Sequence, residues 1–189
     1  MPKDTRTELL DLAERAVRSR GFDAFSYADL ASAIGIRKAS IHYHFPTKAD
    51  LSDALMTRYR ARFSTLLADI NAEHPTGAAR IRALTTLYRT ALHDGSTLCL
   101  CVSFTSSVES LTPAVRTQIK MFREMMASWI ETSVVLGAKD GTVVLNTPAA
   151  NEARAVLALL EGAHLAARAD GDLSRFDDAV VGLLERLKE

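Results

Sequence analysis

The sequence predicts an all-α protein. Along most of the 189 residues, apolar side chains recur at spacings of three and four, which is the periodicity of helices with one buried face. Gly and Pro residues interrupt this pattern where helices would end. Residues 97–104 form a short apolar stretch that could be a strand by composition alone. Because the chain offers it no partner strand, we expect a buried helix or an irregular segment there.

The composition is that of a globular protein with a substantial core, with 48% hydrophobic and 24% charged residues. No apolar run approaches the roughly 20 residues that a membrane-spanning helix needs, so we expect no membrane association and a cytoplasmic location. The net charge is zero, but residues 1–62 hold 11 Lys or Arg against 8 Asp or Glu, whereas the rest holds 12 against 15. This asymmetry favours a basic N-terminal region on an acidic body.

The first helix is expected over residues 4–20, where Leu9, Ala13 and Val17 recur on one face and Gly21 follows as a stop. Phe22 and Phe25 come directly after it. A small N-terminal domain needs bulky side chains to hold its helices together. We therefore expect both phenylalanines in the core.

Two short helices around a tight turn are predicted next. Ser26 is a good N-cap for the first, and Gly35 lies where that helix would end in the left-handed conformation. The second helix carries Ile41 and Phe45 on one face, and Pro46 closes it. Together the two helices and the turn predict a helix-turn-helix.

The outward positions of the second short helix carry cations, hydroxyls and imidazoles. Such groups bind phosphate oxygens and base edges when a helix lies in the major groove. Lys48, in the first turn of the following helix, is poorly placed for the helix dipole, and a bound phosphate would explain it. The predicted partner is double-stranded DNA.

From Gly35 to Lys48 the order is glycine, aliphatic, polar, Lys, small, polar, aliphatic, aromatic pair, Phe, turn, Lys. This order resembles the signature of the TetR family of one-component bacterial repressors. One departure is His42-Tyr43, where an aromatic residue is more usual first, and it leaves the operator sequence open. The resemblance implies a helix-turn-helix domain over residues 1–47, a ligand-binding and dimerising body over 48–189, and DNA contacts from Ser26, Tyr27, Arg37, Lys38, Ser40, His42, Tyr43, His44 and Lys48.

Five longer helices are expected in the body. The first would run as a continuous strut out of the N-terminal domain. Residues 137–141 are the most loop-like stretch of the chain, so a loop is expected there. The expected helices cover residues 48–73, 78–93, 113–136, 149–169 and 172–188.

Aromatic and Met side chains in the body are core residues by default. The resemblance implies instead that the body encloses an apolar cavity for a small-molecule effector, and Met side chains are adaptable enough to line one. The candidates are Tyr88, Phe104, Phe122, Met125, Met126 and Trp129.

Cys99 and Cys101, with one residue between them, cannot readily bond each other, because their α-carbons would lie near the edge of disulfide reach and their side chains would diverge. The simplest interpretation is two small core residues. The alternative, which the resemblance to the TetR family suggests because some of its members carry a Cys in a similar segment, is a thiol that senses oxidants or electrophiles. Such a thiol would require a lowered pKa.

The last two predicted helices have regular apolar stripes that could both face one core. The resemblance implies instead that they pair with their copies in a second subunit as a four-helix bundle. The candidate dimer residues are Val156, Leu160, His164, Val180, Leu183, Leu184 and Leu187.

No set of residues argues for catalysis, since a nucleophile elbow, a phosphate-binding loop and a dinucleotide fingerprint are all missing. Glu161 and His164 have the spacing of half a di-iron site, but the chain has no second such pair, so neither metal nor cofactor is expected. We expect a ligand-responsive repressor that binds operator DNA as a homodimer and is released by a small molecule. The alternatives are a thiol-based sensor, a helical-bundle enzyme that carries a helix-turn-helix, and an interaction adaptor.

Overall fold

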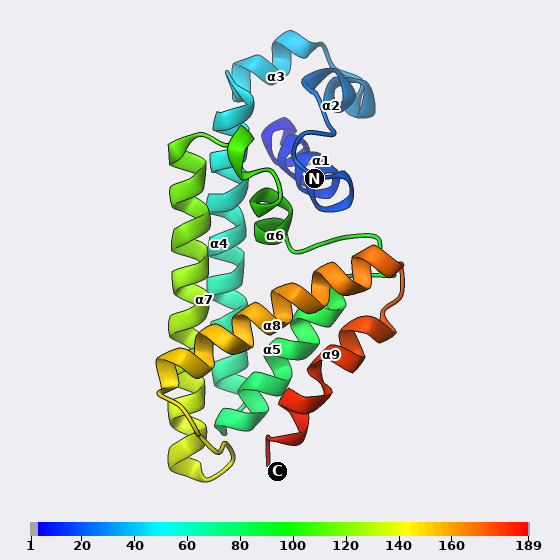
Figure 1. Cartoon of the computed structure of the whole chain (residues 1–189). Helices are drawn as coiled ribbons and strands as arrows, with labels where there is room; N and C mark the ends of the chain where they lie inside the picture. The colour runs from blue at the N-terminus through cyan, green and yellow to red at the C-terminus, as the bar shows by residue number, and fades with distance from the viewer. Residues whose placement is uncertain (1–3, 189) are drawn as a thin grey trace. The chain divides into compact units, whose positions relative to one another are not determined.

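The computed structural model describes residues 4–188, and within this range the chain forms nine α helices and one 3₁₀ helix (Figure 1). The only β-type pairing in that range is an isolated bridge between Val143 and Leu187. The predicted all-α class is confirmed. None of the helices in the described part is both long and apolar enough to cross a bilayer.

The chain divides into two compact units. The first unit holds the residues up to Ala61 together with Leu100–Phe122, and the second holds Arg62–Cys99 together with the residues from Arg123 onward. Two long helices, α4 (Lys48–Glu73) and α7 (Pro113–Asp140), contribute residues to both.

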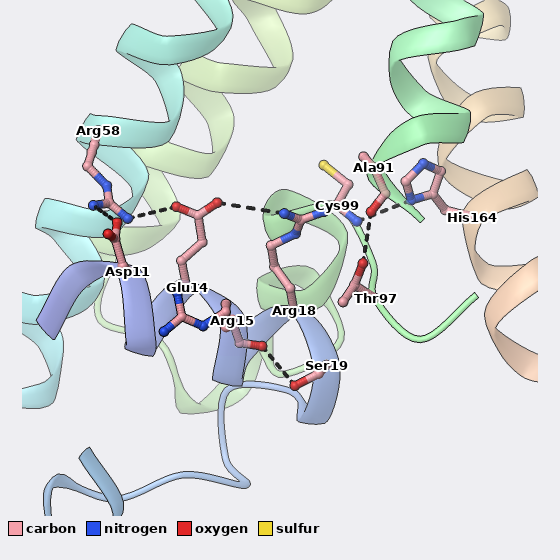
Figure 2. Close-up of polar contacts among 10 residues, drawn as sticks. All are labelled: Asp11, Glu14, Arg15, Arg18, Ser19, Arg58, Ala91, Thr97, Cys99 and His164. Atoms are coloured by element: carbon pink, nitrogen blue, oxygen red, sulfur yellow. Dashed lines mark hydrogen bonds and ion pairs between the residues drawn. The ribbon is translucent and has the colours of Figure 1, made fainter. Parts of the chain in front are cut away.

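In the first unit, α1 packs against α2 and α6, and α2 packs against α3. Arg58 on α4 also binds α1, because its guanidinium group donates to Asp11 at 2.7 Å and to Glu14 at 2.9 Å (Figure 2). In addition to the first parts of α4 and α7, this unit contains α1 (Thr5–Arg20), α2 (Tyr27–Ile34), α3 (Lys38–His44), α6 (Leu100–Thr105) and the 3₁₀ helix Val108–Ser110.

In the second unit, α8 (Ala149–Asp170) packs along α9 (Ser174–Glu185), and α5 (Gly77–Ala91) packs against both. His164 of α8 is completely buried. Its Nδ1 accepts the Cys99 backbone N–H at 3.1 Å, so Nε2 carries the proton and donates to the Tyr88 carbonyl at 2.8 Å. Figure 2 shows His164 beside Cys99. Both ring nitrogens are therefore engaged with the backbone.

The predicted loop at 137–141 is wrong over residues 137–140, because α7 continues to Asp140. The Asp140 carboxylate accepts the Gly77 N–H at 2.9 Å, which ties the last turn of α7 to the start of α5. A Cβ at Gly77 would lie 2.2 Å from the Gly137 nitrogen, and a Cβ at Gly137 would lie 2.3 Å from the Val143 side chain. Gly137 is therefore a close-packing residue inside a helix and not a helix stop.

Candidate nucleic-acid interface

The helix-turn-helix begins at a capping box on α2. Ser26 Oγ accepts the Asp29 N–H at 3.3 Å, and the Asp29 carboxylate accepts the Ser26 N–H at 2.7 Å. Hydrogen bonds from the Ser26 N–H and the Ser26 hydroxyl to this carboxylate hold the pKa of Asp29 below its usual value. At the other end, Gly35 has φ of 69°, a left-handed conformation that ends α2 and starts the turn. The predicted cap and stop are both confirmed.

Tyr27, one of the expected DNA contacts, is 7% exposed and serves as an internal brace. Its hydroxyl lies 3.0 Å from the Phe45 carbonyl and 2.5 Å from the Thr47 carbonyl, where it donates its proton. Burial raises the pKa of Tyr27 to about 12, and the carboxylate of Asp50 adds to this shift. Tyr27 therefore fixes the chain segment that ends α3.

Lys48 has two acceptors inside the protein. Its ammonium group donates to the carbonyls of Phe22 at 2.6 Å and Phe25 at 2.9 Å, and lies 4.3 Å from the centroid of each ring. Partial burial lowers the pKa of Lys48. Because an ammonium group has three N–H donors, at most one remains for an external anion. A local partner thus accounts for a lysine in the first turn of α4.

The outward face of α3 matches the predicted set. Ile41 is fully buried and fixes which side of the helix points inward. Tyr43 is 84% exposed, the highest value among the large exposed apolar side chains. Arg37, Lys38 and His42 are also exposed, and Ser40 and His44 are half-buried.

A surface hollow of about 350 Å³ lies beside this face. Its lining consists of Phe25, Ser26, Tyr27, Lys38, His42 and Lys48. All of these except Phe25 belong to the predicted DNA-binding set, so the structure brings together residues from α2, α3 and α4. Phe25 was expected in the core, where it is indeed 3% exposed, and it also lines the hollow.

Sequence reasoning missed the backbone acceptors of Tyr27 and Lys48. Carbonyl groups leave no signature in the residue types, since every residue carries one. The expected burial of Phe22 and Phe25, whose carbonyls accept from Lys48, is the only hint that the sequence offered.

The candidate effector residues are distributed between the two units. Phe104 and Phe122 are buried in the first unit, and Tyr88 and Met126 are buried in the second. Met125 and Trp129, also in the second unit, are half-buried.

Both cysteines are buried and free of disulfides. The candidate dimer residues are mostly buried within the single chain, with only Leu184 half-buried.

Comparison with known proteins agrees with this geometry. Residues 9–55 match the bacterial regulatory proteins of the tetR family. A solved TetR-family transcriptional regulator from Agrobacterium tumefaciens is 29% identical, has a TM-score of 0.92 and covers 97% of each chain. The helix-turn-helix region therefore matches the TetR family, and the whole chain has the fold of a TetR-family regulator. A TetR regulator from Legionella pneumophila is similar over 99% of each chain, at 27% identity and a TM-score of 0.88.

Among curated relatives, the HTH-type transcriptional regulator TtgR of Pseudomonas putida is 37% identical over 54 residues. The match covers 29% of this chain and about a quarter (26%) of TtgR. The fold of the whole chain and the sequence of its helix-turn-helix region therefore both follow the TetR family.

Proposed function

We propose that this TetR-family chain is a transcriptional repressor that binds double-stranded operator DNA with α3 in the major groove. The observation that carries the proposal is the exposed face of α3, with Arg37, Lys38, His42 and Tyr43 outward and Ile41 buried behind them. Such a helix offers cations to phosphates and polar groups to base edges. The hydrogen bonds of Tyr27 hold the end of α3 in a fixed place.

Selection of the purified full chain against random duplex DNA tests this proposal. We expect one enriched motif, bound with an affinity that falls as salt rises, because phosphate contacts release counterions. Tyr43→Ala and Ser40→Ala should change the preferred bases or weaken binding to the motif. Salt-independent binding, or no enrichment at all, would contradict the proposal.

We further propose a homodimer formed by the outer faces of α8 and α9. Leu165 and Val181 are apolar and about half exposed, at 49% and 46%. Gly162 and Gly182 lie in helices with open space where a Cβ would be. Glycine destabilises a helix interior by about 1 kcal/mol relative to Ala, so its presence on exposed faces suits the close approach of another helix. The residues first expected at this interface are buried within one chain, so the outward residues beside them would make the contact.

The effector is proposed to be a small molecule bound noncovalently beside α7. The indole Nε1 of Trp129 is buried, and no acceptor for it is found among the described residues. A ligand with a hydrogen-bond acceptor would satisfy this donor. Trp129 is the only Trp of the chain, so its fluorescence should change when an effector binds.

A thiol sensor is the second candidate mechanism, and burial of Cys99 and Cys101 counts against it. Apolar surroundings disfavour the reactive thiolate. Rapid, selective labelling of either cysteine by a mild electrophile, with loss of operator binding, would reverse this preference. In the noncovalent mechanism the effector favours a conformer whose two helix-turn-helix domains do not fit successive major grooves.

A further inference from the structure

His42 lies on the outward face of α3, at the position where an aromatic residue is more usual in the family signature. Its Nδ1 lies 3.0 Å from the Pro46 carbonyl oxygen. A carbonyl only accepts, so Nδ1 carries the proton in this contact. The ring also packs edge-on against Tyr27, with the ring centroids 5.0 Å apart. These two contacts fix the orientation of the imidazole and leave Nε2 as its second polar atom.

Charged side chains of both signs lie near His42. Lys38 of α3 and Lys48 of α4 line the same hollow as His42, together with Tyr27 of α2. Among acidic groups, Asp50 of α4 lies near enough to Tyr27 to raise the pKa of that hydroxyl, and Asp23 lies near enough to Lys48 to stabilise its charged form. A hollow of about 350 Å³ with two lysines and an imidazole on its wall suits a phosphate group.

The state of Nε2 decides whether His42 can bind such a phosphate. In the neutral ring, Nδ1 keeps the proton and Nε2 presents a lone pair, which repels a phosphate oxygen. In the protonated ring both nitrogens donate, so Nδ1 keeps its bond to Pro46 while Nε2–H becomes a charged donor. A charge-assisted hydrogen bond to phosphate is about twice as strong as a neutral one.

We propose that His42 is a proton-dependent ligand of a DNA backbone phosphate, so that DNA binding takes up a proton from solvent and strengthens as the pH falls. This inference rests on the proposed DNA binding. Phenylalanine or tyrosine at this position would not change its hydrogen bonding in this way, whereas an imidazole gains a positive charge and a second donor when it is protonated. His42 thus makes the operator affinity of this chain respond to acidity.

Binding of the full chain to its selected DNA motif at about pH 5.5 and about pH 8, over a range of salt, tests this inference. For the wild type we expect binding about tenfold tighter at the lower pH, which corresponds to about 1.4 kcal/mol of binding free energy. The slope of log affinity against log salt should also steepen by about 0.9, the effect of one further neutralised phosphate. Thermal unfolding at both pH values checks that each variant is folded.

His42→Gln should remove the pH ratio and the change in slope, because glutamine does not titrate. His42→Tyr restores the usual aromatic type and should bind DNA with no pH dependence. His44→Gln is the matched control on the same helix and should keep the tenfold ratio. A wild type with equal affinity at both pH values, or a ratio that His44→Gln abolishes and His42→Gln keeps, would overturn the inference. Failure of the wild type to bind any duplex at either pH would instead overturn the proposed function.

Discussion

Lys48 connects α4 with the segment between α1 and α2 through one ammonium group. Its two carbonyl acceptors belong to Phe22 and Phe25, and both rings lie under the cation. The residue was expected to bind phosphate, and its position in the hollow keeps that role available. The structure adds a second role, which is to hold together the first unit.

Lys48→Met should lower the free energy of unfolding by about 1–3 kcal/mol, because hydrogen bonds from a charged donor are lost while the aliphatic stem remains. The matched control, Lys38→Met, changes an exposed lysine and should alter stability by less than about 0.5 kcal/mol. Urea unfolding measures both. A Lys48→Met protein with wild-type stability but weakened binding to all DNA sequences would show that phosphate binding is its main role.

Tyr27 gives the first unit a specific alkaline sensitivity. With a folded pKa of about 12 and an unfolded value near 10, the folded state keeps the phenol proton after the unfolded state has lost it. Stability should therefore fall as the pH rises from about 10 and level off near 12. Tyr27→Phe removes this contribution, so unfolding of wild type and variant across this range should converge as the pH rises. A constant difference between them would contradict the assignment.

At the scale of elements, most helix ends follow local signals. Ser26, Gly35 and the range 48–73 were predicted because caps, stops and apolar spacing are properties of neighbouring residues. The end of α7 was not predicted correctly, because a glycine that can stop a helix can also allow the close approach of a neighbouring helix. Gly137 does the latter, and its neighbour Gly77 is 60 residues away in the sequence.

Gly77→Ala tests this contact between α5 and α7. A Cβ there would meet backbone atoms of Gly137 and Ser133 at 2.2–2.4 Å, so one of the helices must move. Overpacking of this kind costs about 1–3 kcal/mol, measurable by urea unfolding. Ala79→Gly in the same turn should cost only about 1 kcal/mol or less. Unchanged stability in Gly77→Ala would mean that the two helices do not approach so closely.

The faces of α8 and α9 give a second prediction at this scale. Leu165→Glu combined with Val181→Glu places two charges on the outward faces and should yield a folded monomer, because unpaired buried carboxylates are costly at an interface. Val144→Glu changes a 50% exposed apolar residue outside these helices and should leave the dimer intact. Leu183→Glu should instead unfold the chain, since Leu183 is buried within it. Sedimentation and circular dichroism distinguish these outcomes, and a dimer that survives the first pair of changes would place the interface elsewhere.

At the scale of the whole molecule, more of the helix-turn-helix than of the body could be predicted from the sequence. The residues of α2, the turn and α3 are contiguous, so their motif could be recognised and their outward set listed in advance. Dimer residues could not be separated from core residues, because an apolar stripe such as Val156, Leu160 and His164 looks the same in either role. Only the burial of these side chains within one chain showed which face was left outward.

The most direct test of the account is a hydroxyl-radical footprint of the full chain on its selected DNA motif. Two α3 helices of a homodimer should protect two half-sites whose centres lie about one helical turn, or a multiple of it, apart. Tyr43→Ala should weaken both half-sites together, because each subunit contributes the same exposed side chain. A single protected half-site at saturating protein, or a pattern that Tyr43→Ala leaves unchanged, would contradict dimeric recognition through α3.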